Sequence, residues 1–387
     1  MPTILPSVQN TAGSASNVLA AQRVIDMDDT IALLEPSDAP LTVFTKRSGQ
    51  SEECFNPSFS WLEDVLLPRV SATDAAGYAS GATTINVTTG DGTKFNTNDL
   101  VIVPATGEIL LVSSVSTDAL AVTRAFGTTA AAAIPAAVTD LLIIGNTQIE
   151  GATSRNALAT QTQSKTNYAQ IFRTPLGASR TLMDSKLYGG KYEPYQVRKV
   201  GIEHRVEIER SFIWGQPYQN VTSTGGQWAS GGLDYWIQTN RIDGGGTLTY
   251  ATFEKMAETV FRYGNQKMRL GICSPAFMTK VDLLAEARLF FQTTTEVYGV
   301  RINRIQTSHG DVMLVKHPLM QDLTEYNERC YVLDMDKIKQ RPFVNAATKL
   351  KLNIQAPDVD GKKSEYITQM GLQVENQLCH AVLYDVA

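Results

Sequence analysis

Short apolar runs separated by turn residues fill residues 71–145. Val, Ile and Leu recur in groups of four or five, and pairs such as Asp-Gly, Thr-Gly and Thr-Asp stand between several groups. This pattern predicts a series of short β-strands and no helix. Five strands are expected, beginning near Thr84, Leu100, Ile109, Leu120 and Leu141. We therefore predict a small β-barrel or sandwich over this part of the chain.

The segments on either side of this β-rich part have a different pattern. Residues 55–69 indicate an extended strand that ends in a polar stop, and residues 160–175 are rich in Thr and Gln with apolar residues alternating near Ile171. Extended segments that flank one insertion are typical of the two limbs of a hairpin. We interpret residues 71–145 as a module inserted into that hairpin.

A helical period begins after residue 190. Pro194 stands where the first turn of a helix accepts proline, and oppositely charged residues four apart follow, such as Lys199 and Glu203. The pattern predicts a helix from about Pro194 to Trp214, about 30 Å long at 1.5 Å per residue. Its apolar side is narrow, so we expect it to lie across a surface, with His204 among the exposed charges.

The remainder of the chain mixes helices and strands. Residues 253–261 have helical spacing, residues 270–273 are a strand, and Ser274 with Pro275 begins a second helix. Alternating residues around the turn at 308–311 predict a hairpin, and residues 350–374 predict another. The fold class expected for the whole chain is α+β.

Composition and net charge exclude several classes of function. Of 387 residues, 43% are hydrophobic and 19% charged, which is typical of a folded protein with two or three domains. The net charge is −5 and Lys and Arg form no cluster, which argues against a dedicated nucleic-acid binder. No apolar run has the roughly 18 residues of a membrane span, and the start lacks a signal-peptide pattern, so we expect a cytoplasmic location without membrane contact.

No group of residues in the sequence has the spacing of a catalytic or metal site. The four cysteines lie far apart, and none of the four histidines has a Cys, His or Glu at metal-ligand spacing. Asp358 and Asp360 begin a calcium-like loop, but Gln369 stands at its twelfth position, and the glycine run at 244–246 lacks the Lys of a phosphate loop. We predict no catalytic residue, no metal and no cofactor.

Three stretches nevertheless resemble one family. They are residues 38–46, residues 56–68 together with 166–173, and residues 335–341 together with 360–372. In these stretches and in its layout the chain resembles the major capsid proteins of tailed double-stranded-DNA bacteriophages, whose shared structure is called the Hong Kong 97 fold. The resemblance is to the branch with a β-rich insertion in the extended loop.

The resemblance implies a division of the chain and a mode of assembly. The subunit would build hexamers and pentamers of an icosahedral or prolate head around the phage genome, close to double-stranded DNA without reading its sequence. Scaffold, portal and decoration proteins are further partners that the family allows; many relatives carry a removable scaffolding segment, whereas here the arm comes first. The implied parts are an N-terminal arm (1–50), an extended loop (51–70 and 146–175), the β-rich insertion (71–145), a peripheral domain (176–222 and 336–387) and an axial domain (223–335).

Contacts between copies are expected along the arm and the limbs. The arm has too few periodic apolar positions to fold alone, and an extended limb that carries apolar residues would leave a hydrophobic patch on an isolated subunit. The candidate contact residues are Pro40, Phe44, Trp61, Leu62, Leu66, Ile171 and Phe172.

Two other classes of function remain open from the residues. The insertion could bind a glycan, a receptor or a decoration protein at the virion surface, for which exposed aromatic residues would be needed, and it contains only Tyr78, Phe95 and Phe126. A hydrolase with a divergent site is the third class and has the least support.

Overall fold

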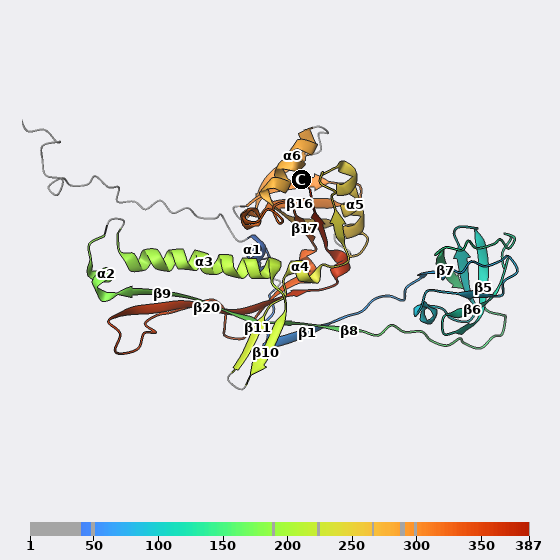
Figure 1. Cartoon of the computed structure of the whole chain (residues 1–387), viewed down its shortest axis with the longest axis horizontal. Coiled ribbons are helices and arrows are strands. Elements are labelled where there is room, and N and C mark those ends of the chain that lie inside the picture. The colour runs from blue at the N-terminus through green and yellow to red at the C-terminus, as the bar shows by residue number, and fades with distance from the viewer. Residues whose placement is uncertain are drawn as a thin grey trace, which may run out of the picture. The chain divides into compact units, whose positions relative to one another are not determined.

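The computed structural model describes residues 40–47, 51–187, 190–222, 225–264, 267–286, 291–297 and 300–386. These residues form two compact units, one made of residues 60–165 and the other of the described residues outside that range. The described residues form both helices and strands (Figure 1), which confirms the mixed helix-and-strand fold class expected from the sequence. The predicted arm over residues 1–50 falls largely outside the described residues.

The 60–165 unit is built on one six-stranded antiparallel sheet with the order β2-β7-β4-β5-β6-β3. Its edge strands are joined, because the amide of Thr88 donates to the carbonyl of Ala72 (2.9 Å) and Thr73 pairs with Val87. All five strands expected from the sequence are present. The strands are β2 (Val70–Ala72), β3 (Thr84–Asn86), β4 (Asp99–Val103), β5 (Glu108–Ser116), β6 (Ala119–Thr123) and β7 (Asp140–Asn146), with a 3-10 turn η2 (Asp91–Lys94).

Alternate residues of these strands fill a single core. Val101, Leu110 and Leu141 are buried at its centre, as the period of two along a strand requires. The turn after β5 packs tightly against η2: a Cβ on Gly92 would lie 1.7 Å from the carbonyl oxygen of Thr117, so only glycine fits there.

The larger unit contains a seven-stranded mixed sheet with the order β12-β21-β17-β13-β16-β15-β14. Its central strands are buried on both faces and are accordingly apolar, except for Arg269, which pairs with Asp334 at 2.8 Å. The strands are β12 (Arg241–Asp243), β13 (Met268–Cys273), β14 (Phe291–Val297), β15 (Val300–Gln306), β16 (Asp311–Lys316), β17 (Cys330–Leu333) and β21 (Ala381–Tyr384).

Helices α5 (Tyr250–Phe261) and α6 (Pro275–Glu286) cover one face of this sheet. Helix α6 begins as predicted, because the hydroxyl of Ser274 accepts the amide of Phe277 at 3.1 Å. The other face packs against the long helix and its sheet through residues such as Leu270 and Leu333. The same unit contains α4 (Leu233–Trp236) and the turns η3 (Pro318–Asp322), η4 (Met335–Lys337) and η5 (Gln377–Cys379).

The predicted long helix is α3 (Tyr192–Trp214), and Figure 1 shows it lying along two long strands. These are β9 (Gln170–Ser179) and β20 (Gly361–Val374), which pair antiparallel over ten residues. The buried side of α3 is a stripe at intervals of four: Val200, His204, Ile208 and Phe212. The expectation that His204 is exposed is therefore wrong, because the histidine occupies an apolar-stripe position.

The remaining elements complete the larger unit. Strands β18 (Ile338–Pro342) and β19 (Lys349–Lys351) pair with β20, as the predicted C-terminal hairpin requires. Among the described residues, no helix is both long and apolar enough to span a bilayer. The other elements are α1 (Pro40–Arg47), α2 (Arg180–Asp184) and the hairpin β10 (Tyr218–Thr222) with β11 (Gly225–Ala229). The paired strands β1 (Ser58–Glu63) and β8 (Gln163–Tyr168) each have residues in both units.

Candidate assembly surface

Three of the predicted contact residues are exposed. Leu66 is 94% exposed, Leu62 71% and Ile171 45%. On the limb, Val65 and Leu67 are exposed as well. Residues 62–67 therefore present four large aliphatic side chains on one short segment, which we call the apolar limb.

The other four predicted contact residues are wholly or partly buried in the subunit itself. Phe172 lies in the main core, where the alternation of β9 turns it inward and its neighbour Ile171 outward. Pro40 and Trp61 are buried, and Phe44 packs against the same core as Phe172. The expectation that Trp61 belongs to an exposed patch is wrong, whereas the role of these four residues as contacts between copies stays a prediction.

Helix α1 is fixed at its start by a buried carboxylate of α3. The two oxygens of Glu209 accept the amides of Leu41 (2.6 Å) and Thr42 (2.9 Å), and His317 lies 3.1 Å from the first oxygen. The first turn of a helix has amides without partners, and a negative charge there is favourable. Glu209 thus acts as an N-terminal cap supplied from another element.

A second buried side chain fixes the rest of α1. The amide nitrogen of Gln340, on β18, donates to the carbonyl of Thr42 (2.9 Å) and to the hydroxyl of Thr45 (2.5 Å). Helix α1 is therefore bound within its own subunit from Leu41 to Thr45. Sequence analysis did not identify Glu209 or Gln340, although Ala39 before the helix offers no capping oxygen and signals that a cap must come from elsewhere.

Three of the four histidines, His204, His317 and His380, are buried and form hydrogen bonds within the fold. The ring of His204 lies between the hydroxyls of Thr174 (2.8 Å) and Thr368 (2.7 Å), and burial lowers its pKa. His380 accepts the amide of Asp334 at Nδ1 and lies 3.2 Å from the carbonyl of Glu375 at Nε2, and burial lowers its pKa to about 4.

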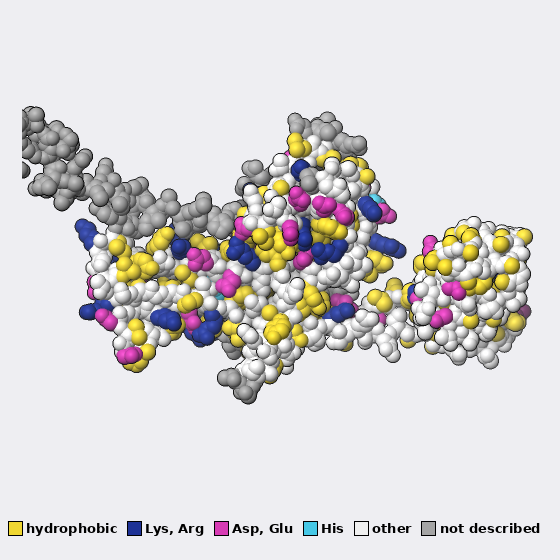
Figure 2. Space-filling model, in the orientation of Figure 1, with side chains coloured by type: hydrophobic (Ala, Val, Ile, Leu, Met, Phe, Trp, Pro, Cys, Tyr) yellow, Lys and Arg dark blue, Asp and Glu magenta, His cyan; other side chains and the backbone are white. Residues whose placement is uncertain are grey.

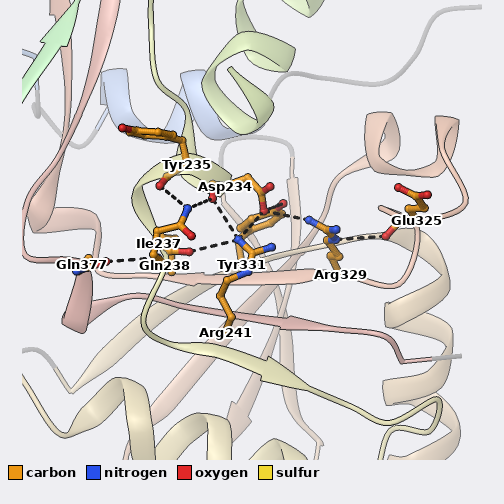
Figure 3. A network of polar contacts seen from close by, with 9 residues as sticks. All are labelled: Asp234, Tyr235, Ile237, Gln238, Arg241, Glu325, Arg329, Tyr331 and Gln377. Carbon is orange, nitrogen blue, oxygen red and sulfur yellow. Dashed lines mark hydrogen bonds and ion pairs between the residues drawn. The ribbon is translucent and has the colours of Figure 1, made fainter. Parts of the chain in front are cut away.

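A polar network holds α4 against the sheet (Figure 3). One oxygen of Asp234 accepts hydrogen bonds from Arg241 (3.1 Å), Arg329 (3.0 Å) and the hydroxyl of Tyr331 (3.2 Å). Burial and the nearby carboxylate raise the pKa of Tyr331, so the phenol stays a donor. Three donors on one carboxylate oxygen bind α4 to β12 and β17.

Buried charges in the 60–165 unit are also paired. Arg124 forms a two-pronged ion pair with Glu108, at 2.8 and 2.7 Å, and the amides of Ala125 and Ala132 donate to the same carboxylate. The bond from Arg124 is the first cause that lowers the pKa of Glu108. The pair fixes the loop after β6 to the start of β5.

The thiols and carboxylates show no arrangement for metal binding among the described residues. All four cysteines are free and buried, and Cys273 faces Cys330 across neighbouring strands. Among the described residues, the apolar limb and the outer surface of the unit that contains it are available for interaction.

Comparison with known proteins identifies the family. The chain matches the family model of the SU10 major capsid protein over residues 7–387. No curated protein matches it. Among solved structures it is similar to "Mycobacterium phage Adephagia", with 10% identity, a TM-score of 0.50, and coverage of 97% of this chain and 98% of that chain.

A second structure, "Mycobacterium phage Bobi", is 9% identical with a TM-score of 0.50, and the match covers 96% of this chain and 98% of that one. At such identities the likeness shows the fold, which is the Hong Kong 97 type across nearly the whole chain. The chain belongs to the SU10 major capsid protein family and is a structural major capsid protein of a tailed bacteriophage, as the resemblance in its sequence indicated.

Proposed function

We propose that this subunit assembles as hexamers and pentamers into a closed head around the phage genome, and that neighbouring copies bury the apolar limb. The observation that carries the proposal is the exposure of Leu62, Val65, Leu66 and Leu67. Full burial of such a side chain contributes roughly 1.5–3 kcal/mol, so the limb favours association by several kcal/mol.

The division into an arm, an extended loop, an insertion, a peripheral domain and an axial domain belongs to the same proposal. In it, α3 with β9 and β20 forms the peripheral domain, and the seven-stranded sheet with α5 and α6 forms the axial domain. The seven-stranded sheet has a packed hydrophobic core on each face, and the buried charges are paired. Both features support a rigid subunit that keeps the same structure at every position of a shell.

We place assembly in the cytoplasm of the host, with scaffold, portal and decoration proteins as further partners. The net charge of −5 repels DNA phosphates weakly, so we infer proximity to the packaged DNA without binding to its sequence. We further infer a role without catalysis, which the use of His204, His317 and His380 in packing supports.

The competing hypothesis of a glycan-binding insertion has little support from its aromatic residues. Phe95 is buried in the core of the insertion. The hydroxyl of Tyr78 bonds to Asp74 and accepts the amide of Asn86 at 2.9 Å, which leaves Phe126 as its exposed large aromatic side chain. A glycan site would need several such rings together.

A single charge on the limb tests the proposal. Leu66→Asp should leave the subunit folded, because the side chain has no core contact to lose, and should prevent closed shells in negative-stain images. Leu66→Met keeps the apolar surface and should assemble normally. Normal shells from Leu66→Asp would contradict a contact through the limb.

The arm is tested separately by a truncation that spares α1. Removal of residues 1–39 leaves the helix that Glu209 caps, so circular dichroism should still show a folded subunit with a cooperative unfolding transition. We expect subunits or small oligomers on size-exclusion chromatography. Closed shells of normal size from this truncation would show that the arm is dispensable.

A further inference from the structure

The outer face of the inserted sheet is apolar on four neighbouring strands. An antiparallel sheet with one face in water normally alternates apolar and polar residues. Strands β4, β5 and β7 instead carry near-continuous runs, Leu-Val-Ile-Val, Ile-Leu-Leu-Val and Leu-Leu-Ile-Ile. Such runs are typical of strands that are covered on both faces, yet the core of this unit covers one.

The outward residues form a row straight across the strands. Val70 on β2 lies opposite Leu142 on β7, Leu142 opposite Ile102 on β4, and Ile102 opposite Ile109 on β5. Val70 is 54% and Leu142 38% exposed, and the other two are partly exposed. Phe126 extends the row, since its amide donates to the carbonyl of Ile109 and its ring is exposed.

A second row lies next to the first and has the same character. Leu100 on β4 is opposite Leu111 on β5, and both are partly exposed. We call the two rows the aliphatic face. None of its six strand residues is charged.

Strands β6 and β3, at the other side of the same sheet, do not have large aliphatic residues at their outward positions. Outward positions of β6 and β3 hold Ala121 opposite Thr84 and Ala119 opposite Asn86. Small and polar residues are what an exposed face normally shows. The aliphatic face is therefore a local property of four strands and not of the whole unit. In Figure 2, hydrophobic side chains are spread over this unit and charged ones are few.

We propose that the aliphatic face packs against the same face of the insertion in a second copy of this chain. The inference rests on the proposed function, in which each subunit is surrounded by copies of itself. Two sheet faces of regular aliphatic rows fit together at about 10 Å, as in a β-sandwich. A two-fold contact requires a surface complementary to itself, which an uncharged apolar sheet face provides.

Two features favour a second copy over other occupants. The apolar limb at 62–67 continues after two residues into Val70, so a neighbour seated on the limb adjoins the aliphatic face. The rows carry a single aromatic ring, Phe126, where a sugar site would need several, and no basic residue for a nucleic acid. Both observations point to a partner with the same aliphatic chemistry.

Single cysteine substitutions in assembled particles test the contact. The native cysteines are buried and lie outside residues 60–165, so we expect no disulfide between subunits from them. Val70→Cys, Leu142→Cys and Ile102→Cys sample the row, and Asn86→Cys on the polar half of the sheet is the matched control. After mild oxidation we expect at least one row variant to shift from monomer to disulfide-linked dimer on a denaturing gel, while Asn86→Cys stays monomeric.

Maleimide labelling of the same particles distinguishes the outcomes. Row variants should be protected in particles and labelled in dissociated subunits. Protection without any dimer would mean that another molecule covers the face, and full labelling in particles would mean that it stays open; either result overturns the inference while leaving the shell proposal intact. Failure of the wild type to form particles would instead overturn the proposed function.

Discussion

His380 makes the stability of the subunit depend on pH in a defined window. Its Nδ1 accepts the amide of Asp334 at 3.1 Å and its Nε2 lies 3.2 Å from the carbonyl of Glu375, so the neutral ring satisfies both neighbours. A proton on Nδ1 would remove the acceptor that Asp334 uses. Burial, as the larger cause, together with the positive charges of Arg269 and Lys337, lowers the pKa of His380 to about 4.

The sign and size of the effect follow from proton binding. Below its ordinary pKa of 6.5 the unfolded chain takes up a proton at this position, whereas the folded chain does so near pH 4. Stability is therefore complete above pH 6.5 and falls as the pH drops, by about 1.4 kcal/mol per pH unit. The total loss is about 3 kcal/mol, the product of that slope and the difference between 6.5 and 4.

Urea unfolding of the unassembled subunit, followed by circular dichroism at several pH values, measures this loss. His380→Gln should flatten the dependence between about pH 6.5 and about pH 4.5, above the range where lowered carboxyl pKa values act. His204 titrates in the same direction, so the difference between variant and wild type is the quantity to compare. His309→Gln controls for loss of a histidine from an exposed turn. An unchanged slope in His380→Gln would refute the reasoning.

Two further variants test the groups that hold α1 and α3. Glu209→Gln removes the charge that caps α1 and should lower the free energy of unfolding by about 3 kcal/mol. Glu203→Gln, on the exposed side of α3, is the control. Equal urea midpoints for the two variants would contradict the cap. Val206→Pro removes a backbone donor in the middle of α3 and should cost about 3 kcal/mol or more, so that particles fail to form while Val206→Ile still assembles; a normal yield from the proline variant would show that α3 tolerates a break.

The sequence predicted elements whose pattern is local. The strands around Leu100, Ile109 and Leu141 have the short apolar runs of a sheet, and α3 has its proline start and its charged face. His204 was misplaced because charges on both sides conceal its place in a stripe of period four. The sequence did not separate the exposed from the buried contact candidates for a related reason, since neighbours on a strand, such as Ile171 and Phe172, face opposite ways.

The features that the sequence did not predict depend on distant partners. Glu209 caps amides 167 and 168 positions away, and no local pattern marks a charged residue as the cap of another helix. The residues of the aliphatic face appear in the sequence as unbroken apolar runs. The sequence does not show, however, which residues of neighbouring strands lie opposite one another. Only the pairing of Val70 with Leu142 and of Leu142 with Ile102 shows that the outward residues meet.

The pairing of β1 with β8 makes the inserted unit exchangeable. The chain leaves along β1 and returns along its hydrogen-bonded neighbour β8, and adjacent strands lie about 4.8 Å apart. A foreign domain whose own ends lie close together can therefore be grafted between these strands without stretching the parent fold. Each subunit would then carry one foreign domain, so the number of subunits sets the number of foreign domains.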